Sequence, residues 1–166
     1  CAGSDALKTD VANAPAYDWV IDRDEWGIPT GKGETDADAA YALAIAHAED
    51  DFESIQGVYF AANGKAGLLN GREGAGSDFL YHLFEVQTRV DTYYEQALSA
   101  DVKALLEAYA DGLNAYAMQH PKEVEKGIWP LSGKDVAQTY LLFSPLFYGV
   151  DSAVGGLAAG TLDPCS

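Results

Sequence analysis

The apolar positions of the chain recur at helical spacing in three long segments and at strand spacing in one short segment. Between Tyr41 and Tyr59, apolar side chains follow one another at intervals of four and three residues, which is one face of a helix. Thr35 predicts the N-cap, and Asp36 and Asp38 place carboxylates in the first turn, where the helix dipole favours them. The pattern predicts a long helix beginning near residue 36.

Two further helical stripes cover residues 79–97 and 102–116. Ser99 is a good N-cap for the second of these helices, and Pro121 lies just beyond its end. Residues 63–78 hold five glycines and predict a connecting loop.

Near the N-terminus the period changes to two. Tyr17, Trp19 and Ile21 alternate with aspartates, and a turn containing Gly27 and Pro29 follows. This pattern predicts one short strand. A single strand leaves its backbone groups unpaired, so we expect it to join a sheet on another chain.

Residues 133–148 predict a fourth helix with apolar and aromatic side chains on almost every side. Ser132 predicts its N-cap, Asp135 takes the third position of a capping box, and Pro145 should bend the helix or end it early. The run is shorter than the roughly 20 apolar residues that span a bilayer. It is also too apolar for a surface helix, so we expect another part of the protein to cover its far side.

Composition narrows the possible partners. The chain has 166 residues, of which 48% are hydrophobic, and a formal net charge of −16. Such a surface repels the phosphates of nucleic acids, so no nucleic-acid partner is expected, and it equally repels anionic lipid headgroups. The simplest interpretation of this acidity is that it keeps the protein soluble or suits it to a saline environment. The more specific alternative is an acidic site that binds a cation.

The chain divides by composition into a flexible leader (1–16), a folded domain (17–150) and a flexible C-terminal tail or spacer remnant (151–166). The two cysteines lie at opposite ends. Cys1 could carry lipid as in a bacterial lipoprotein, or form a disulfide with Cys165, or both thiols could be free. The first two alternatives favour export from the cytoplasm.

Catalytic motifs are missing from the sequence. There is no H-E-x-x-H, no cysteine–histidine cluster with zinc spacing, no G-x-S-x-G and no P-loop. His47, His82 and His120 are expected as surface or interface residues. His82 and Glu85 have a spacing that could pair two metal ligands, although a simple helix-face pair is the expected arrangement.

Four segments together resemble the small α chain of the penicillin amidase family, which comprises penicillin, cephalosporin and glutaryl, and acyl-homoserine lactone acylases. The resemblance covers about 17–149, and "GLNAYA" with "PLSGKDV" is most similar to the cephalosporin and glutaryl branch. The segments are "DRDEWGIP", "YALAIAHAEDDFESIQ", "LLEAYADGLNAYAMQHP" and "WPLSGKDVAQTYLLF".

This resemblance implies a mainly α chain, with about four helices and a short N-terminal strand, that completes a four-layer αββα N-terminal-nucleophile hydrolase fold with a separate β chain. It implies an exported precursor that cuts itself into α and β chains in the periplasm. The catalytic serine would begin the β chain, so the α chain would hold no catalytic residue. Ser166 has no following Asn in the sequence and is not assigned as that nucleophile.

The resemblance also places substrate-binding residues near the end of the fourth helix. Ser144, Phe147 and Tyr148 stand where penicillin acylases carry a methionine, an arginine and a phenylalanine of the acyl pocket. Phe147 in place of arginine removes a charge and favours an apolar acyl group. Phe143 and Leu146 are weaker candidates, since both could equally pack in the core.

No organic cofactor is implied. The family's α-chain calcium ligand falls near Val154, which leaves Asp151 as a weak substitute. The expected function is hydrolysis of an N-acyl amide, either a β-lactam side chain or an N-acyl homoserine lactone, by a complex of this chain with the β chain. The alternative is a non-catalytic acidic periplasmic lipoprotein or binding module with a helical-bundle fold.

Overall fold

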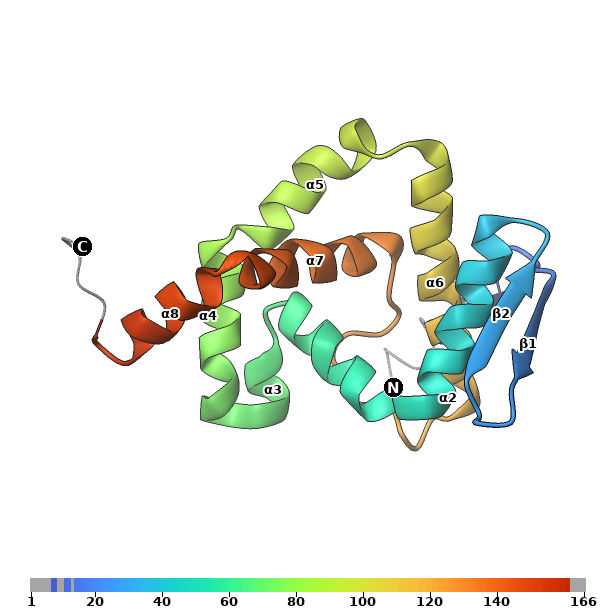
Figure 1. The fold of residues 1–166 in the computed structure, drawn as a ribbon, viewed down its shortest axis with the longest axis horizontal. Helices are drawn as coiled ribbons and strands as arrows, with labels where there is room; N and C mark the ends of the chain where they lie inside the picture. Colours follow the sequence, from blue (N-terminus) through green and yellow to red (C-terminus); the bar gives the residue numbers. More distant parts are fainter. Residues whose placement is uncertain (1–6, 9–10, 13, 162–166) are drawn as a thin grey trace.

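The computed structural model describes residues 7–8, 11–12 and 14–161, which form a mainly helical array with one β-hairpin at its edge (Figure 1). The expectation of a mainly α chain with a small strand content is confirmed. The elements are β1 (Trp19–Arg23), β2 (Pro29–Gly33), α2 (Asp36–Ala62), α3 (Ala66–Asn70), η1 (Gly71–Gly74), α4 (Ala75–Leu83), α5 (Val86–Ala97), α6 (Ala100–Gln119), α7 (Gly133–Phe143), η2 (Ser144–Tyr148) and α8 (Val150–Ala158).

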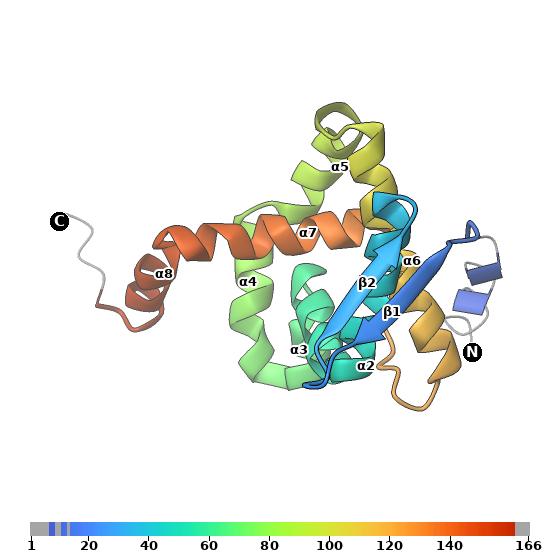
Figure 2. The same cartoon turned by 45° about the vertical axis from the view of Figure 1, so that its right-hand side comes forward.

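The hairpin corrects the prediction of a single strand. β1 pairs antiparallel with β2, with Trp19 opposite Gly33, and the two strands lie beside α2 (Figure 2). The glycines of β2 let this strand approach the helix. A Cβ atom on Gly33 would lie 2.2 Å from the Cβ of Asp38, and one on Gly31 would lie 3.1 Å from the Cβ of Ala42.

Helix α2 begins where the sequence predicts. The amide of Asp38 donates to Thr35 Oγ1 at 3.2 Å, and the Asp38 carboxylate accepts from the amide of Thr35 at 3.0 Å, which completes a capping box. The same carboxylate accepts from the amide of Asp18 at 2.9 Å. At Asp51 the helix bends, because this residue leaves helical geometry and its carboxylate caps Ser54 of the second half.

The segment predicted as a loop is largely helical. Asp78 of α4 accepts hydrogen bonds from the amides of Ala66 (2.7 Å) and Gly67 (2.9 Å). The start of α3 is therefore capped by a residue more than ten positions later in the sequence. Gly74 allows the turn between these helices, because a Cβ there would lie 2.4 Å from the carbonyl of Ala66. The glycines of this segment therefore serve close packing.

The helix predicted over 79–97 is two helices. Glu85 has a φ of 52°, in the left-handed region, and the chain changes direction there between α4 and α5. The apolar stripe continues through the break, which is why periodicity alone did not reveal it. The break also separates His82 from Glu85, the pair considered as metal ligands.

The main core lies between α2 and α6, which pack closely through small residues. A Cβ on Gly112 would lie 2.7 Å from the Cβ of Ala44. Asn114 of α6 is fully buried and binds both backbone groups of Leu131, its Nδ2 donating to the carbonyl and its Oδ1 accepting from the amide, each at 2.8 Å. Asn114 thereby fixes the connector that leads into α7.

The start and end of α7 are both as predicted. The Asp135 carboxylate accepts hydrogen bonds from the amide (2.8 Å) and the hydroxyl (2.6 Å) of Ser132. The α-helix ends at Phe143, just before Pro145, and continues as the short 3-10 helix η2. α8 follows and projects from the array, although composition favoured a flexible tail over residues 151–166 (Figure 1).

Two further findings concern the ends of the chain and the possibility of a membrane-spanning helix. Leu7, in the segment expected to be a flexible leader, is buried in the main core. Within the described ranges, none of the helices combines the length and the hydropathy that a membrane span requires. Cys1 and Cys165 lie outside the described residues, so the alternatives for them stay open.

Candidate functional site

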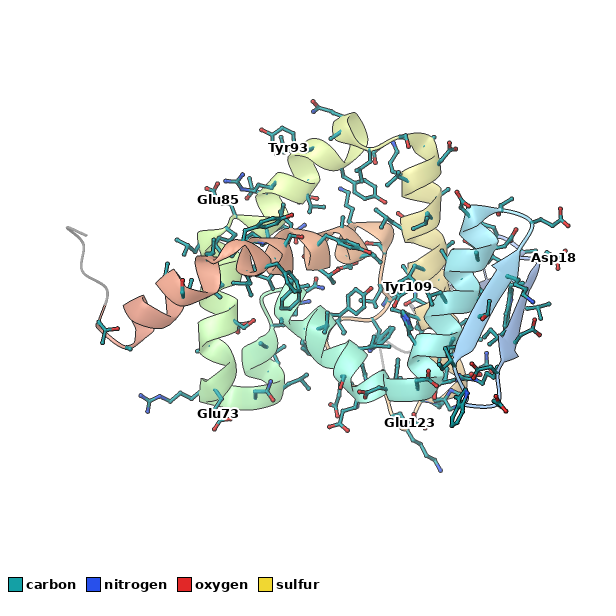
Figure 3. The ribbon with its side chains drawn as sticks, in the orientation of Figure 1. Asp18, Glu73, Glu85, Tyr93, Tyr109 and Glu123 are labelled. Carbon is teal, nitrogen blue, oxygen red and sulfur yellow. The ribbon has the colours of Figure 1, made fainter. Side chains whose placement is uncertain are left out.

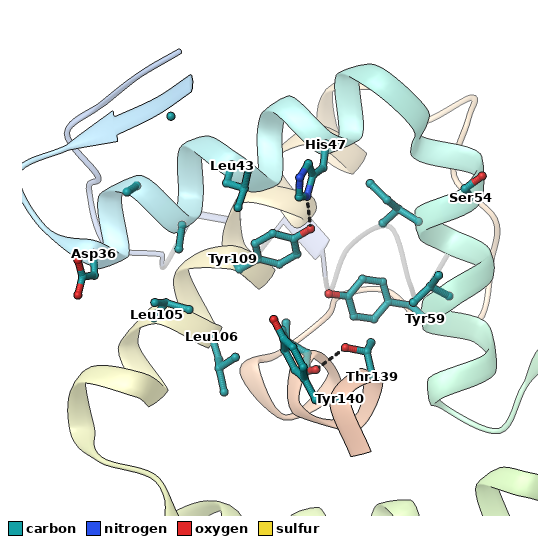
Figure 4. Close-up of a pocket in the computed structure, with 16 residues that line it drawn as sticks. Asp36, Leu43, His47, Ser54, Tyr59, Leu105, Leu106, Tyr109, Thr139 and Tyr140 are labelled. Carbon is teal, nitrogen blue, oxygen red and sulfur yellow. Dashed lines mark hydrogen bonds between the residues drawn. The ribbon is translucent and has the colours of Figure 1, made fainter. Parts of the chain in front are cut away.

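Three tyrosines from three helices converge on one pocket, here called the tyrosine pocket. Tyr59 comes from α2, Tyr109 from α6 and Tyr140 from α7, and the pocket has a volume of about 660 Å³ (Figure 4). Figure 3 shows Tyr109 among these helices, whereas Glu73 and Glu85 lie at the periphery. The remaining lining is mostly apolar and includes Leu43, Ile55, Val58, Leu105, Leu106 and Val136.

The polar side chains that line this pocket are those of the three tyrosines together with Asp36, His47, Ser54 and Thr139. The hydroxyl of Tyr109 lies 2.8 Å from Nδ1 of His47. Burial raises the pKa of Tyr109 to about 12, with a contribution from Tyr140, and burial raises the pKa of Tyr59 further. Both phenols therefore keep their protons at neutral pH and offer a donor and an acceptor each.

A second groove runs between α5 and α7, here called the α5–α7 groove. Its volume is about 790 Å³, and it shares Leu105, Leu106 and Tyr140 with the tyrosine pocket. Arg89 is the charged side chain among its lining residues. The uncharged lining comprises Val90, Tyr93, Tyr94, Ala97, Leu98, Val102, Ala137, Leu141, Ser144, Pro145 and Tyr148 along with the shared residues.

One carboxylate links α5, α6 and α7 beside this groove. Glu107 of α6 accepts from the amide of Gly133 in α7 at 2.8 Å and from the hydroxyl of Tyr94 in α5 at 3.3 Å. A Cβ on Gly133 would lie 2.4 Å from that hydroxyl, so the glycine is needed for the helices to meet.

Two of the five predicted substrate-binding residues line the α5–α7 groove. They are Ser144 and Tyr148. Phe147 is 88% exposed and Tyr148 87% exposed, so η2 presents both aromatic side chains to solvent. Leu146 is half-buried and lines neither pocket, and Phe143 packs against a cluster of buried residues that includes Tyr81 and Leu142. The assignment of these residues to substrate stays a prediction.

The histidines have separate surroundings. His47 is exposed and contacts Tyr109, while His120 stacks on Tyr116 with 3.9 Å between ring centroids. Among the described residues, no group of three or more His, Cys, Asp or Glu side chains could hold a metal ion. The side chain of Val154 has no oxygen that could bind calcium, and the weak assignment of calcium to Asp151 stays a prediction.

Sequence reasoning missed the tyrosine pocket. Tyr59 and Tyr109 stand on the apolar stripes of their helices, where spacing predicts core packing. A stripe shows which side of a helix faces inward, but it does not show that the helices diverge there. The available signal was the abundance of tyrosine, ten residues in the chain, since a buried phenol needs a partner for its hydroxyl.

Comparison with known proteins identifies the class to which this helical scaffold belongs. Residues 19–152 match the penicillin amidase family. The chain belongs to the penicillin amidase family.

Two relatives illustrate the match. The penicillin acylase 2 proenzyme of Pseudomonas sp. (strain SE83) is 35% identical over 109 residues, which are 65% of this chain and 14% of that protein. A structure of thermostable penicillin G acylase from Alcaligenes faecalis superposes with a TM-score of 0.60 at 20% identity, covering 77% of this chain and 72% of that one. The second comparison shows a shared fold. The chain thus spans a small part of the proenzyme to which it is similar.

Proposed function

We propose that this chain is the α subunit of an acylase that hydrolyses the amide bond of an N-acyl substrate, with the nucleophilic serine on a second chain of the same precursor. Family membership and the similarity to a proenzyme support the subunit role. The observation that carries the proposal is that η2 exposes Phe147 and Tyr148 almost completely, and that Tyr148 lines an apolar groove. Large exposed apolar side chains that border a groove are typical of a binding surface.

In this proposal Ser144, Phe147 and Tyr148 form one wall of the acyl-binding pocket, and the second chain supplies the nucleophile and the donors that stabilise the tetrahedral intermediate. Two of these three side chains are aromatic and none carries a charge, so the wall favours an apolar acyl group. Burial of each methylene contributes about 0.8 kcal/mol, so longer aliphatic chains gain affinity as far as the wall extends. The leaving group is a β-lactam nucleus or a homoserine lactone.

The proposal includes export to the periplasm and processing of a precursor. Mass spectrometry of the native protein, purified from cells that carry the whole gene, tests this directly. We expect a co-purifying larger chain with an N-terminal serine. A single chain with no hydrolytic partner would refute the subunit role.

The acyl wall is tested by Phe147→Ala, compared across a series of N-acyl amides. We expect kcat/KM to fall about 10-fold for long apolar acyl groups and much less for short ones, because the lost contact is hydrophobic. Phe79→Ala is the control, since Phe79 is also an exposed phenylalanine but lies on α4, outside both pockets. An equal loss for all chain lengths would assign Phe147 to packing alone.

A further inference from the structure

A chain of side-chain hydrogen bonds links α4, α5 and α7. At its centre is Gln87 of α5, whose Oε1 accepts from the hydroxyl of Tyr81 at 3.0 Å and from Nε2 of Gln138 at 3.2 Å. Nε2 of Gln87 donates to Asp91 at 2.9 Å, and Asp91 also accepts from Nζ of Lys134 at 3.0 Å. The two bonds between α5 and α7 lie about one helical turn apart, so they fix both the separation and the register of these helices.

Gln138 is buried with only part of its hydrogen-bonding capacity used. It is 2% exposed, and among the described residues its Oε1 has no hydrogen-bond partner. The carboxylate of Asp91 only accepts, so Gln87 turns its Nε2 to Asp91 and its Oε1 to Gln138. A buried carbonyl without a partner costs stability, and an apolar side chain of the same size would avoid that cost. A residue that costs stability in this way is typical of a functional constraint.

The neighbours of these two glutamines line the α5–α7 groove. Ala137 precedes Gln138 on α7 and Leu141 follows it by about one turn, while Val90 lies about one turn after Gln87 on α5. The two helices lie side by side (Figure 1). Because a helix is rigid over so few residues, the bond between Gln87 and Gln138 determines how far apart the groove-lining side chains stand. Hydrogen bonds have a narrow range of length and direction, so they specify this separation more sharply than apolar contacts do.

We infer that Gln138 is a positioning residue that, through Gln87, holds α7 at the distance from α5 at which the α5–α7 groove accepts a long apolar acyl chain. This inference rests on the proposed function, because the same groove carries Ser144 and Tyr148 of the proposed acyl wall. Gln138 lines neither pocket, so it acts through the position of α7 and not through contact with the substrate. A single buried Asn fixes the register of helices in coiled coils in the same way.

Gln138→Met tests the inference in the complete, processed protein. Methionine has a similar volume and helix propensity, so the variant loses the bond to Gln87 together with the unpaired carbonyl, and its urea midpoint should equal or exceed that of the parent. The substrates are N-acyl amides that share one leaving group and range from butanoyl to dodecanoyl. We expect KM to rise about 3- to 10-fold for the long acyl chains and much less for the short ones, with kcat unchanged. A purely structural role predicts no change in this chain-length preference.

A double-variant cycle tests whether the two glutamines act together. Gln87→Met breaks the same bond from the other helix, so it should shift the chain-length preference in the same direction as Gln138→Met. The double variant should add little to the effect of either single variant, because the bond can be lost only once. Effects that add in full would assign separate roles to the two residues and contradict the inference.

Two other glutamines outside both pockets provide matched controls. Gln56 of α2 is also buried (3% exposed) and bonds the carbonyl of Glu123 and the amide of Glu125, so Gln56→Met should lower the urea midpoint and leave the chain-length preference unchanged. Gln96 of α5 is exposed and bonds within its own helix, so Gln96→Met should change neither quantity. A shift of preference in Gln56→Met as large as that in Gln138→Met would overturn the inference, because lost stability alone would then alter the groove.

The outcomes separate this inference from the function on which it rests. If the complex hydrolyses N-acyl amides and Gln138→Met keeps the preference of the parent, the function stands and the inference is wrong. If Gln138→Met lowers kcat equally for every chain length, Gln138 supports the fold as a whole and the inference is again wrong. If the parent complex hydrolyses no N-acyl amide, the function itself fails and the inference falls with it.

Discussion

Asn114 offers a sharp test of how the fold positions α7. The side chain is fully buried in α6 and makes two hydrogen bonds of 2.8 Å to the backbone of Leu131. Ser132, the next residue, begins the capping box of α7, so these bonds set the point from which that helix starts. Substitution Asn114→Ala removes both bonds and leaves a buried amide and a buried carbonyl unpaired.

The expected cost follows from this geometry. Each buried backbone group left without a partner costs about 1–3 kcal/mol, so two cost about 2–6 kcal/mol. Alanine returns about 0.7 kcal/mol or less through its higher helix propensity. The net loss in the free energy of unfolding should be about 1–5 kcal/mol, which is a large share of the stability of an ordinary domain.

Urea denaturation of the purified complex, followed by circular dichroism, measures this loss. Gln96→Ala is the control, because Gln96 bonds a backbone carbonyl of its own exposed helix at 3.0 Å. It should change stability by less than about 0.5 kcal/mol. A loss below about 1 kcal/mol for Asn114→Ala would refute the reasoning and show that water or a shifted connector replaces the bonds.

Two further predictions concern α2. Gly112→Val should destabilise the protein by about 2 kcal/mol or more in thermal unfolding. The Cβ atom of the valine would lie 2.7 Å from the Cβ of Ala44 and 2.8 Å from the carbonyl oxygen of Tyr41, so an unchanged Tm would contradict that packing. The pKa of Asp38 is lowered, and the largest cause is the hydrogen bond from the Thr35 hydroxyl. The Asp38 carboxylate therefore contributes stability above the unfolded-state pKa of about 3.9, and this contribution is lost as the pH falls below that value. Asp38→Asn should therefore be less stable than the parent at pH 7, and this difference should shrink in denaturation curves measured below pH 4; a constant difference would exclude the linkage.

The parts of the fold that sequence could predict are those with local causes. Thr35, Ser99 and Ser132 stand at helix starts because each cap is satisfied within three residues, and Pro145 ends α7 through its own ring. The α3–α4 segment was not predictable in this way, because the group that caps α3 is Asp78, twelve residues beyond Ala66.

The candidate site was predictable only in part for the same reason. The resemblance placed Ser144, Phe147 and Tyr148 on the chain, and the structure shows Ser144 and Tyr148 beside one groove. The tyrosine pocket depends on how α2, α6 and α7 diverge. That divergence is set by tertiary contacts such as Asn114 with Leu131, which periodicity does not contain.

Glu107 ties the two helices that wall the α5–α7 groove to each other. Its carboxylate takes one hydrogen bond from α5 and one from α7, so the distance between the two walls is fixed at that point. Tyr148 and Ser144 line the same groove, where η2 continues the wall after the α-helix has stopped. Substitutions in η2 lie away from the bonds of Glu107, which makes these few residues the natural place to alter the size of group that the groove accepts.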